Sequence, residues 1–199
     1  MTETEKPYHH GALRHALLEA AERAVRERGV DNLSLRGLAR ETGVSHGAPR
    51  RHFADRQALL DALAEYGFER LSSELSAAVL GAGEAFIGRL RAATAAYVRF
   101  AIHDSALLEL MFAGKHRDGA AALQEAAERG LSVMLKLIEQ GQAQGFLGVG
   151  DPERVGLILF STVHGIAALV IAGMVQPEQL DQLLADSIEH FLRGSRYGC

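Results

Sequence analysis

Apolar residues along this chain recur at helical spacing. From Leu13 to Ala24 they are separated by four, three and four positions, which places them on one face of a helix. A second stripe of this kind runs from Leu60 to Ala78 and ends near two glycines. No segment alternates apolar and polar residues with a period of two, so we expect an all-α fold. Further helices are predicted over about 84–102, 105–113, 119–144, 152–174 and 177–193.

Residues 34–53 carry the pattern of a helix-turn-helix. Ser34 is a good N-cap for a short helix whose leucines face inward. Gly43 follows that helix, where the turn needs a left-handed backbone that disfavours a Cβ atom. Val44 then fills the angle before a second helix, expected over about 45–52. This second helix is the candidate for entering the major groove of DNA.

The side chains of the second helix suit that task. Small or flat residues at its start allow a close approach to base edges, and His46 can hydrogen-bond a base or a phosphate. Cationic residues follow at its end, where phosphates pass. Asp55 is expected to cap the next helix, whose amide end could hold a phosphate beside Arg56.

Charge distinguishes this segment from the rest of the chain. The 199 residues include 21 Lys and Arg against 25 Asp and Glu, a formal net charge of −4. Residues 32–56 hold five arginines against Glu41 and Asp55, a local charge of +3. A polyanionic partner, double-stranded DNA, is therefore expected to bind here.

Composition excludes several other classes of protein. A hydrophobic content of 48% with 23% charged residues argues against disorder. The single cysteine, Cys199, excludes a disulfide framework and a cysteine-rich metal site. Residues 1–20 carry no charged stub followed by an apolar run, so we expect no secretory signal and a cytoplasmic location. We expect no cofactor and no bound metal.

An uncharged stretch from Val155 to Val175 is long enough to span a bilayer. It contains polar residues and three glycines, however, and no Lys/Arg cluster flanks it. We expect no membrane insertion but a helix buried in a core or between subunits.

Together these features resemble the DNA-binding domain of the TetR/AcrR family of bacterial regulators. The resemblance covers residues 8–70, about a third of the chain. The segments that carry it are Tyr8-His9-His10-Gly11, Ser34 to Val44, Ser45-His46-Gly47-Ala48-Pro49, His52-Phe53 and Asp55-Arg56-Gln57-Ala58-Leu59-Leu60. Val163-His164-Gly165 is similar to a His-Gly element found in one group of the family's C-terminal domains.

The resemblance implies a DNA-binding three-helix bundle over residues 1–55, a connecting helix at about 55–80, and a helical ligand-binding and dimerisation domain over 81–199. Most members are homodimeric repressors that a small molecule releases from an operator. Here the homodimer would form through the helices at 152–174 and 177–193. The sequence leaves repressor and activator both open.

Position by position, the resemblance assigns roles to ten residues. Ser34, Ser45, His52 and Arg56 match phosphate contacts, and Arg36 matches a site where some members read a base. His46, Gly47, Ala48 and Pro49 lie on the segment whose surface faces the bases. Arg50 stands where the family usually has a phosphate-binding tyrosine, and its charge keeps that contact possible.

A cavity for an apolar effector is expected among the helices of residues 84–174. His164 is expected to be a satisfied interior histidine, and the histidines fit no short metal-ligand spacing. Two alternatives are a DNA-binding regulator without small-molecule control and an enzyme that uses the helical body, for which no nucleophile–base motif is present. The candidate ligand-binding residues are Tyr97, Phe100, His103, Met111, Phe112, Met134, Phe160 and His164.

Overall fold

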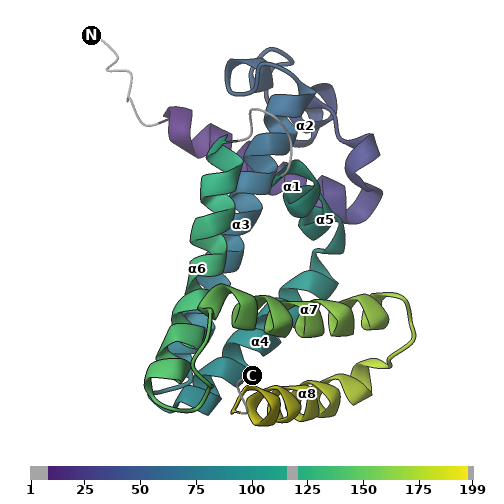
Figure 1. Cartoon of the computed structure of the whole chain (residues 1–199). Helices are drawn as coiled ribbons and strands as arrows, with labels where there is room; N and C mark the ends of the chain where they lie inside the picture. Colours follow the sequence, from purple (N-terminus) through teal and green to yellow (C-terminus); the bar gives the residue numbers. More distant parts are fainter. Residues whose placement is uncertain (1–8, 116–120, 197–199) are drawn as a thin grey trace. The chain divides into compact units, whose positions relative to one another are not determined.

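A computed structural model describes residues 9–115 and 121–196 (Figure 1). Every regular element within them is helical, which confirms the predicted all-α fold. Tyr8 and the first two residues of the helix predicted over 119–144 lie outside the described residues. The α-helices are α1 (His9–Arg28), α2 (Leu35–Glu41), α3 (Arg56–Gly81), α4 (Phe86–His103), α5 (Ser105–Lys115), α6 (Ala121–Ala143), α7 (Pro152–Ile171) and α8 (Leu180–Arg196), and the 3₁₀ turns are η1 (Val30–Asn32), η2 (Pro49–Arg51) and η3 (Pro177–Gln179).

The described residues pack as two compact units. The N-terminal unit comprises residues 9–67 together with 106–115 and 121–124, and the C-terminal unit comprises 68–105 and 125–196. The long helix α3 therefore contributes its first part to one unit and its second part to the other. The functional division at residues 55 and 81 stays a prediction.

The core of the N-terminal unit forms where the apolar stripes of α1, α2 and α3 meet. Leu17 on α1, Leu38 on α2 and Leu63 on α3 are each at most 1% exposed. The stripe predicted between Leu13 and Ala24 is buried except for half-buried Leu13. Burial of these side chains supplies most of the free energy that holds the short helix α2 in place, since a helix of this length is unstable alone.

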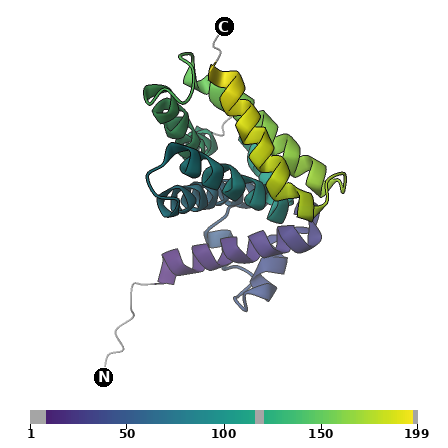
Figure 2. The same ribbon diagram turned by 90° about the horizontal axis from the view of Figure 1, so that it is seen from below.

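The C-terminal unit is built around α4, which packs against α7 and α8. Helices α7 and α8 also lie side by side, as Figures 1 and 2 show from two directions. Helix α7 begins as predicted at residue 152, where the Asp151 side chain caps it. The helix predicted over 177–193 begins instead as the 3₁₀ turn η3 at Pro177 and continues as α8 from Leu180.

Helix α7 buries one face and exposes the other. Leu159, Val163 and Ile166 are buried, whereas Leu157 and Ile158 are 62% and 55% exposed. This helix is also the one described element that is long and apolar enough to cross a membrane. An apolar face this exposed is unusual for a lone subunit, and such faces commonly mark an interaction surface.

Arg70 and Asp104 form an ion pair inside the C-terminal unit. Asp104 directly follows α4 and its side chain is 1% exposed, whereas Arg70 lies on α3. The Arg70 guanidinium lies 4.5 Å from the centroid of the Phe100 ring, and its Nε is 3.1 Å from a Glu74 carboxylate oxygen. A buried carboxylate is costly unless it is paired, so the end of α4 depends on this contact.

The difference in burial between the two carboxylates beside Arg70 predicts unequal effects of their substitution. Asp104→Asn should lower the free energy of unfolding by about 3 kcal/mol, because it leaves a largely buried cation without its buried partner. The Glu74 side chain is 45% exposed, so Glu74→Gln should lower the free energy of unfolding by less than about 1 kcal/mol. Urea unfolding of the full chain measures both free energies. Equal losses of stability in the two variants would contradict the conclusion that Asp104 is the main partner of Arg70.

Candidate nucleic-acid interface

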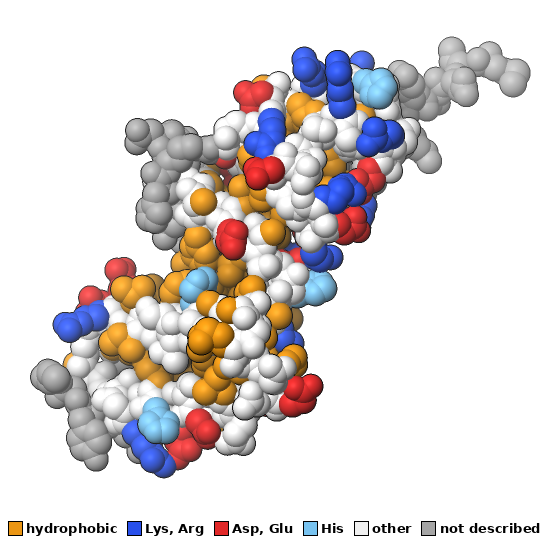
Figure 3. All heavy atoms as spheres, turned by 90° about the vertical axis from the view of Figure 1, so that its right-hand side faces the viewer, with side chains coloured by type: hydrophobic (Ala, Val, Ile, Leu, Met, Phe, Trp, Pro, Cys, Tyr) orange, Lys and Arg blue, Asp and Glu red, His pale blue; other side chains and the backbone are white. Residues whose placement is uncertain are grey.

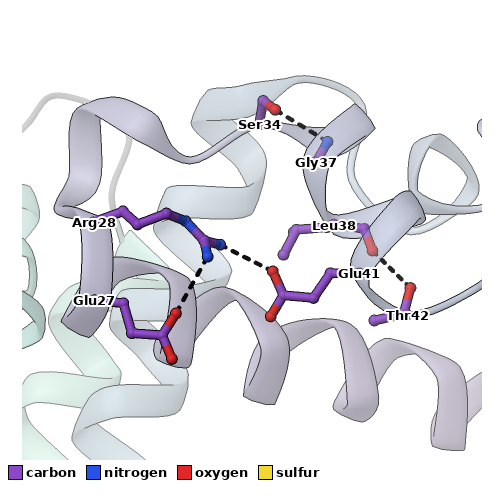
Figure 4. Close-up of polar contacts among 7 residues, drawn as sticks. All are labelled: Glu27, Arg28, Ser34, Gly37, Leu38, Glu41 and Thr42. Atoms are coloured by element: carbon purple, nitrogen blue, oxygen red, sulfur yellow. Dashed lines mark hydrogen bonds and ion pairs between the residues drawn. The ribbon is translucent and has the colours of Figure 1, made fainter.

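Hydrogen bonds and an ion pair fix both ends of α2 (Figure 4). At its start the Ser34 hydroxyl accepts a hydrogen bond from the Gly37 N–H at 3.1 Å, which confirms the predicted N-cap. At its end Glu41 accepts a hydrogen bond from Arg28 of α1 at 2.9 Å. The helix is therefore held to α1 by charge as well as by apolar burial.

A left-handed turn at Gly43 ends α2. Gly43 has a φ of 69°, and its N–H donates to the Arg40 carbonyl at 3.4 Å. The next N–H, of Val44, donates to the Ala39 carbonyl at 3.0 Å. These two bonds form a Schellman motif, whose central residue is usually glycine because other residues are strained there. The predicted role of Gly43 is confirmed.

The segment after this turn is not the α-helix predicted over 45–52. Residues 46–48 form a turn, and Pro49–Arg51 form the single 3₁₀ turn η2. The N–H groups of Ala48 and Arg51 donate to carbonyls three residues earlier, at 2.9 and 3.2 Å. Pro49 has no N–H with which to close an α-helical bond, and Gly47 lowers helix propensity. The tighter winding follows from these two residues.

Two residues join this segment to the start of α3. The Phe53 side chain is 2% exposed, and the Arg14 guanidinium of α1 lies 5.7 Å from its ring centroid. Asp55 accepts a hydrogen bond from the Ala58 N–H at 2.8 Å, which confirms it as the N-cap of α3. Residues 45–52, which we call the turn segment, are thus fixed at one end by the turn at Gly43 and at the other end by the buried Phe53.

Between these elements lies an open depression of about 760 Å³, which we call the basic depression. Its walls come from the start of α2, from the turn segment and from the start of α3. Three arginines against one aspartate give it a formal charge of +2. Blue basic side chains are numerous in the upper part of Figure 3, with red acidic side chains among them. The basic depression is lined by Ser34, Leu35, Arg36, His46, Gly47, Arg50, Ala54, Asp55 and Arg56.

The structure thus brings together six of the ten residues predicted to bind DNA. The other four are Ser45, Ala48, Pro49 and His52, which belong to the turn segment but do not line the depression. Ser45 is exposed, Ala48 and His52 are half-buried, and Pro49 is buried. Leu35, Ala54 and Asp55 line the depression without having been predicted as DNA contacts.

Arg56 makes contacts that the sequence pattern did not predict. Its Nε donates to the Leu33 carbonyl at 3.1 Å, and its Nη2 donates to the Val30 carbonyl at 2.7 Å. Both acceptors lie in the connection between α1 and α2, 23 and 26 residues away along the chain. Spacing along the sequence carries no signal for such a pairing.

In the C-terminal unit, three of the predicted ligand-binding residues form one cluster. Tyr97 of α4 is buried, and its hydroxyl lies 2.9 Å from Nδ1 of His164 on α7. The Phe160 ring stacks on the His164 ring, with 5.4 Å between centroids. Burial raises the pKa of the Tyr97 hydroxyl. The protonated hydroxyl can donate a hydrogen bond to Nδ1 of His164 in the tautomer that carries its proton on Nε2.

His164 itself is exposed, so the prediction of an interior histidine is wrong in that respect. Although exposed, it reaches the buried Tyr97 hydroxyl through Nδ1 and stacks on the half-buried Phe160 ring. Of the other candidates, Phe100 is buried, Met134 is half-buried and His103 is exposed. Met111 and Phe112 belong to the N-terminal unit.

A short helix, a glycine turn and a 3₁₀ turn surround a basic depression, and a helical unit with an exposed apolar helix follows. This arrangement is the one expected of a class of DNA-binding regulators. A family model of bacterial regulatory proteins of the tetR family matches residues 17–63, and a tetracyclin repressor-like C-terminal domain matches residues 90–192. The chain belongs to the TetR family of DNA-binding transcriptional regulators.

Three relatives illustrate the similarity. A protein of unknown function from Rhodococcus sp. RHA1 is 46% identical, with a TM-score of 0.86 over 96% of this chain and 100% of that chain. The HTH-type transcriptional repressor Rv1474c of Mycobacterium tuberculosis is 29% identical over 191 residues, which are 94% of this chain and 96% of the relative. The fatty acid degradation regulator FadR from Bacillus halodurans, 16% identical, shares the fold, with a TM-score of 0.71 over 90% of this chain and 98% of that one.

Proposed function

We propose that this regulator is a homodimeric repressor that binds duplex DNA through the basic depression and the turn segment beside it. The observation that carries this proposal is the depression itself, where three arginines from three different segments meet. Arg50 would contact a phosphate, and Arg36 and His46 would face base edges. The similarity to the repressor Rv1474c supports repression over activation. A cytoplasmic location follows from this role.

This proposal predicts two kinds of mutant. Arg50→Gln should weaken binding to all duplexes and lower the slope of log affinity against log salt by about 0.9 for each phosphate that is no longer neutralised. His46→Ala and Arg36→Ala should instead relax the choice of sequence, with a loss of about 1–3 kcal/mol on the duplex that the wild type selects from a random library. Fluorescence anisotropy over a salt series separates the two.

Arg91→Gln serves as the control, because Arg91 is an exposed arginine on α4 in the C-terminal unit. It should bind as the wild type does. If the Arg50 and His46 variants lost affinity in the same way, the division into phosphate and base contacts would be wrong.

We infer that the dimer forms through α7 and α8. Besides Leu157 and Ile158, α7 exposes Leu169 and Ile171, by 39% and 52%. A Cβ atom added at Gly165 would meet nothing within 4 Å, so this face of α7 is open to a partner helix. Paired copies would bury this face in a four-helix bundle, and two N-terminal units could then meet two half-sites of an operator.

Two substitutions test this interface. Ile158→Glu should make the chain monomeric at micromolar concentration in analytical ultracentrifugation, because it buries a charge at the subunit contact. Val149→Glu changes a residue that is 95% exposed in the connection before α7, and it should leave the dimer intact. A wild-type monomer, or an Ile158→Glu protein that stays dimeric, would exclude α7 as the interface.

We also propose that a small apolar effector bound in the C-terminal unit releases the DNA. The cluster of Tyr97, Phe160 and His164 supports this, because it joins aromatic surface to one polar edge. The effector would bind the non-operator arrangement of the dimer more tightly and lower DNA affinity by that difference. The alternatives are a regulator without small-molecule control and an enzyme that uses the same unit.

A thermal-shift screen of the full chain with fatty acids and flat aromatic compounds tests effector control. A compound that binds should, at a free concentration of 100 times its Kd, raise the free energy of unfolding by about 2.7 kcal/mol. The same compound should release the selected duplex. Tyr97→Phe, which removes the hydroxyl but keeps the ring, should weaken that compound's effect. Stabilising compounds that leave duplex affinity unchanged would favour a regulator without such control.

A further inference from the structure

We propose that Arg56 is a positioning residue that holds the basic depression in its DNA-binding shape, rather than a contact to a DNA phosphate. This inference rests on the proposed function. Three arginines line the depression. Among the described contacts, Arg56 is the one of the three whose guanidinium donates hydrogen bonds to backbone carbonyls of another segment.

The two hydrogen bonds of Arg56 connect two walls of the depression. Arg56 is the first residue of α3, and its Nε donates to the carbonyl of Leu33, the residue directly before the α2 cap Ser34. The wall formed by the start of α3 is therefore tied to the wall formed by the start of α2. Under the proposed function a sugar-phosphate backbone would lie against both walls, so their separation would affect how well it fits.

The second acceptor is shared, which strengthens the connection. The Val30 carbonyl oxygen accepts two hydrogen bonds, one from Arg56 Nη2 at 2.7 Å and one from the Leu33 N–H at 3.1 Å. Arg56 thus holds the 3₁₀ turn η1 at the same point where that turn closes on itself. Because Nε and Nη2 are neighbours in one rigid plane, a single side chain fixes both carbonyls at once.

The position of Arg56 on its helix is consistent with this role. A cation at the first residue of a helix is disfavoured by the helix dipole, and Asp or Glu is the usual charged residue there. Carbonyl oxygens of the α1–α2 connection supply the negative partial charges that offset this effect. Arg50 has no comparable hydrogen bond among the described contacts. Because both arginines are exposed, their hydrogen bonds and not their burial distinguish them.

Arg56→Lys discriminates between the two roles, because lysine keeps the charge but has one nitrogen in place of the rigid pair. If Arg56 positions the walls, the binding-competent shape becomes a minor state, and affinity for the selected duplex should fall about tenfold. The salt slope and the affinity for a scrambled duplex at low salt should stay unchanged, because both depend on charge alone. Arg56→Gln should lose specific affinity to the same extent.

The matched comparison is Arg50→Lys, which should keep most of its affinity because an ammonium still neutralises a phosphate. All affinities are measured at a temperature where urea titrations show every variant to be folded. Hydrogen exchange in the absence of DNA provides a second readout: amides of residues 33–38 should exchange faster in Arg56→Lys than in the wild type.

A wild-type measurement covers the case in which the variants fail to fold. The Arg56 Nε–H should be protected from exchange with water in the free full chain and should stay protected, without a new phosphate contact, in the presence of the selected duplex. Full affinity in Arg56→Lys, or a salt slope that falls by about 0.9 in Arg56→Gln, the value for one phosphate, would overturn this inference alone. A wild-type chain that selects no duplex would overturn the proposed function as well.

Discussion

Hydrogen bonds from side chains to the backbone hold the three segments around the basic depression. Ser34 caps α2, Asp55 caps α3, and Arg56 joins the start of α3 to carbonyls that precede α2. Helix α2 has only seven residues, so most of its backbone groups lie in its first or last turn and lack partners within the helix. The positions of Arg36 and Arg50 therefore depend on these few polar contacts and on the buried Phe53.

The distribution of charge and apolar surface gives the two units chemically different surfaces. The chain carries a net charge of −4, yet the basic depression carries +2. A polyanion is therefore repelled by most of the molecule and attracted to one place, which favours a single docking mode over non-specific adhesion. The C-terminal unit offers instead an apolar face on α7, and a second copy would remove that face from water. Both features suit a symmetric molecule with one DNA-binding unit per copy.

Much of this arrangement can be predicted from the sequence, because helical periodicity and caps are local properties. The stripes between Leu13 and Ala24 and between Leu60 and Ala78, and the turn at Gly43, follow from residues a few positions apart. The segment over 45–52 was predicted wrongly because the helix-turn-helix pattern outweighed Gly47 and Pro49, which together favour a 3₁₀ turn.

What could not be predicted is which polar groups meet across long stretches of chain. Arg56 contacts a carbonyl 26 residues earlier, and Arg70 pairs with a carboxylate 34 residues later. Periodicity identifies which face of a helix is buried, but it does not specify the partner of a charged side chain on that face. The exposure of His164 was missed for a related reason, since an uncharged helix was assumed to be buried on all sides although α7 exposes one of its faces.

Hydrogen exchange of the full chain, with and without the duplex that it selects from a random library, tests the central claim most directly. If the basic depression binds DNA, amide exchange should slow in peptides that cover residues 34–56 and stay unchanged on the exposed face of α7. Protection confined to the C-terminal unit, or no change at residues 34–56 under saturating duplex, would contradict DNA binding through the basic depression.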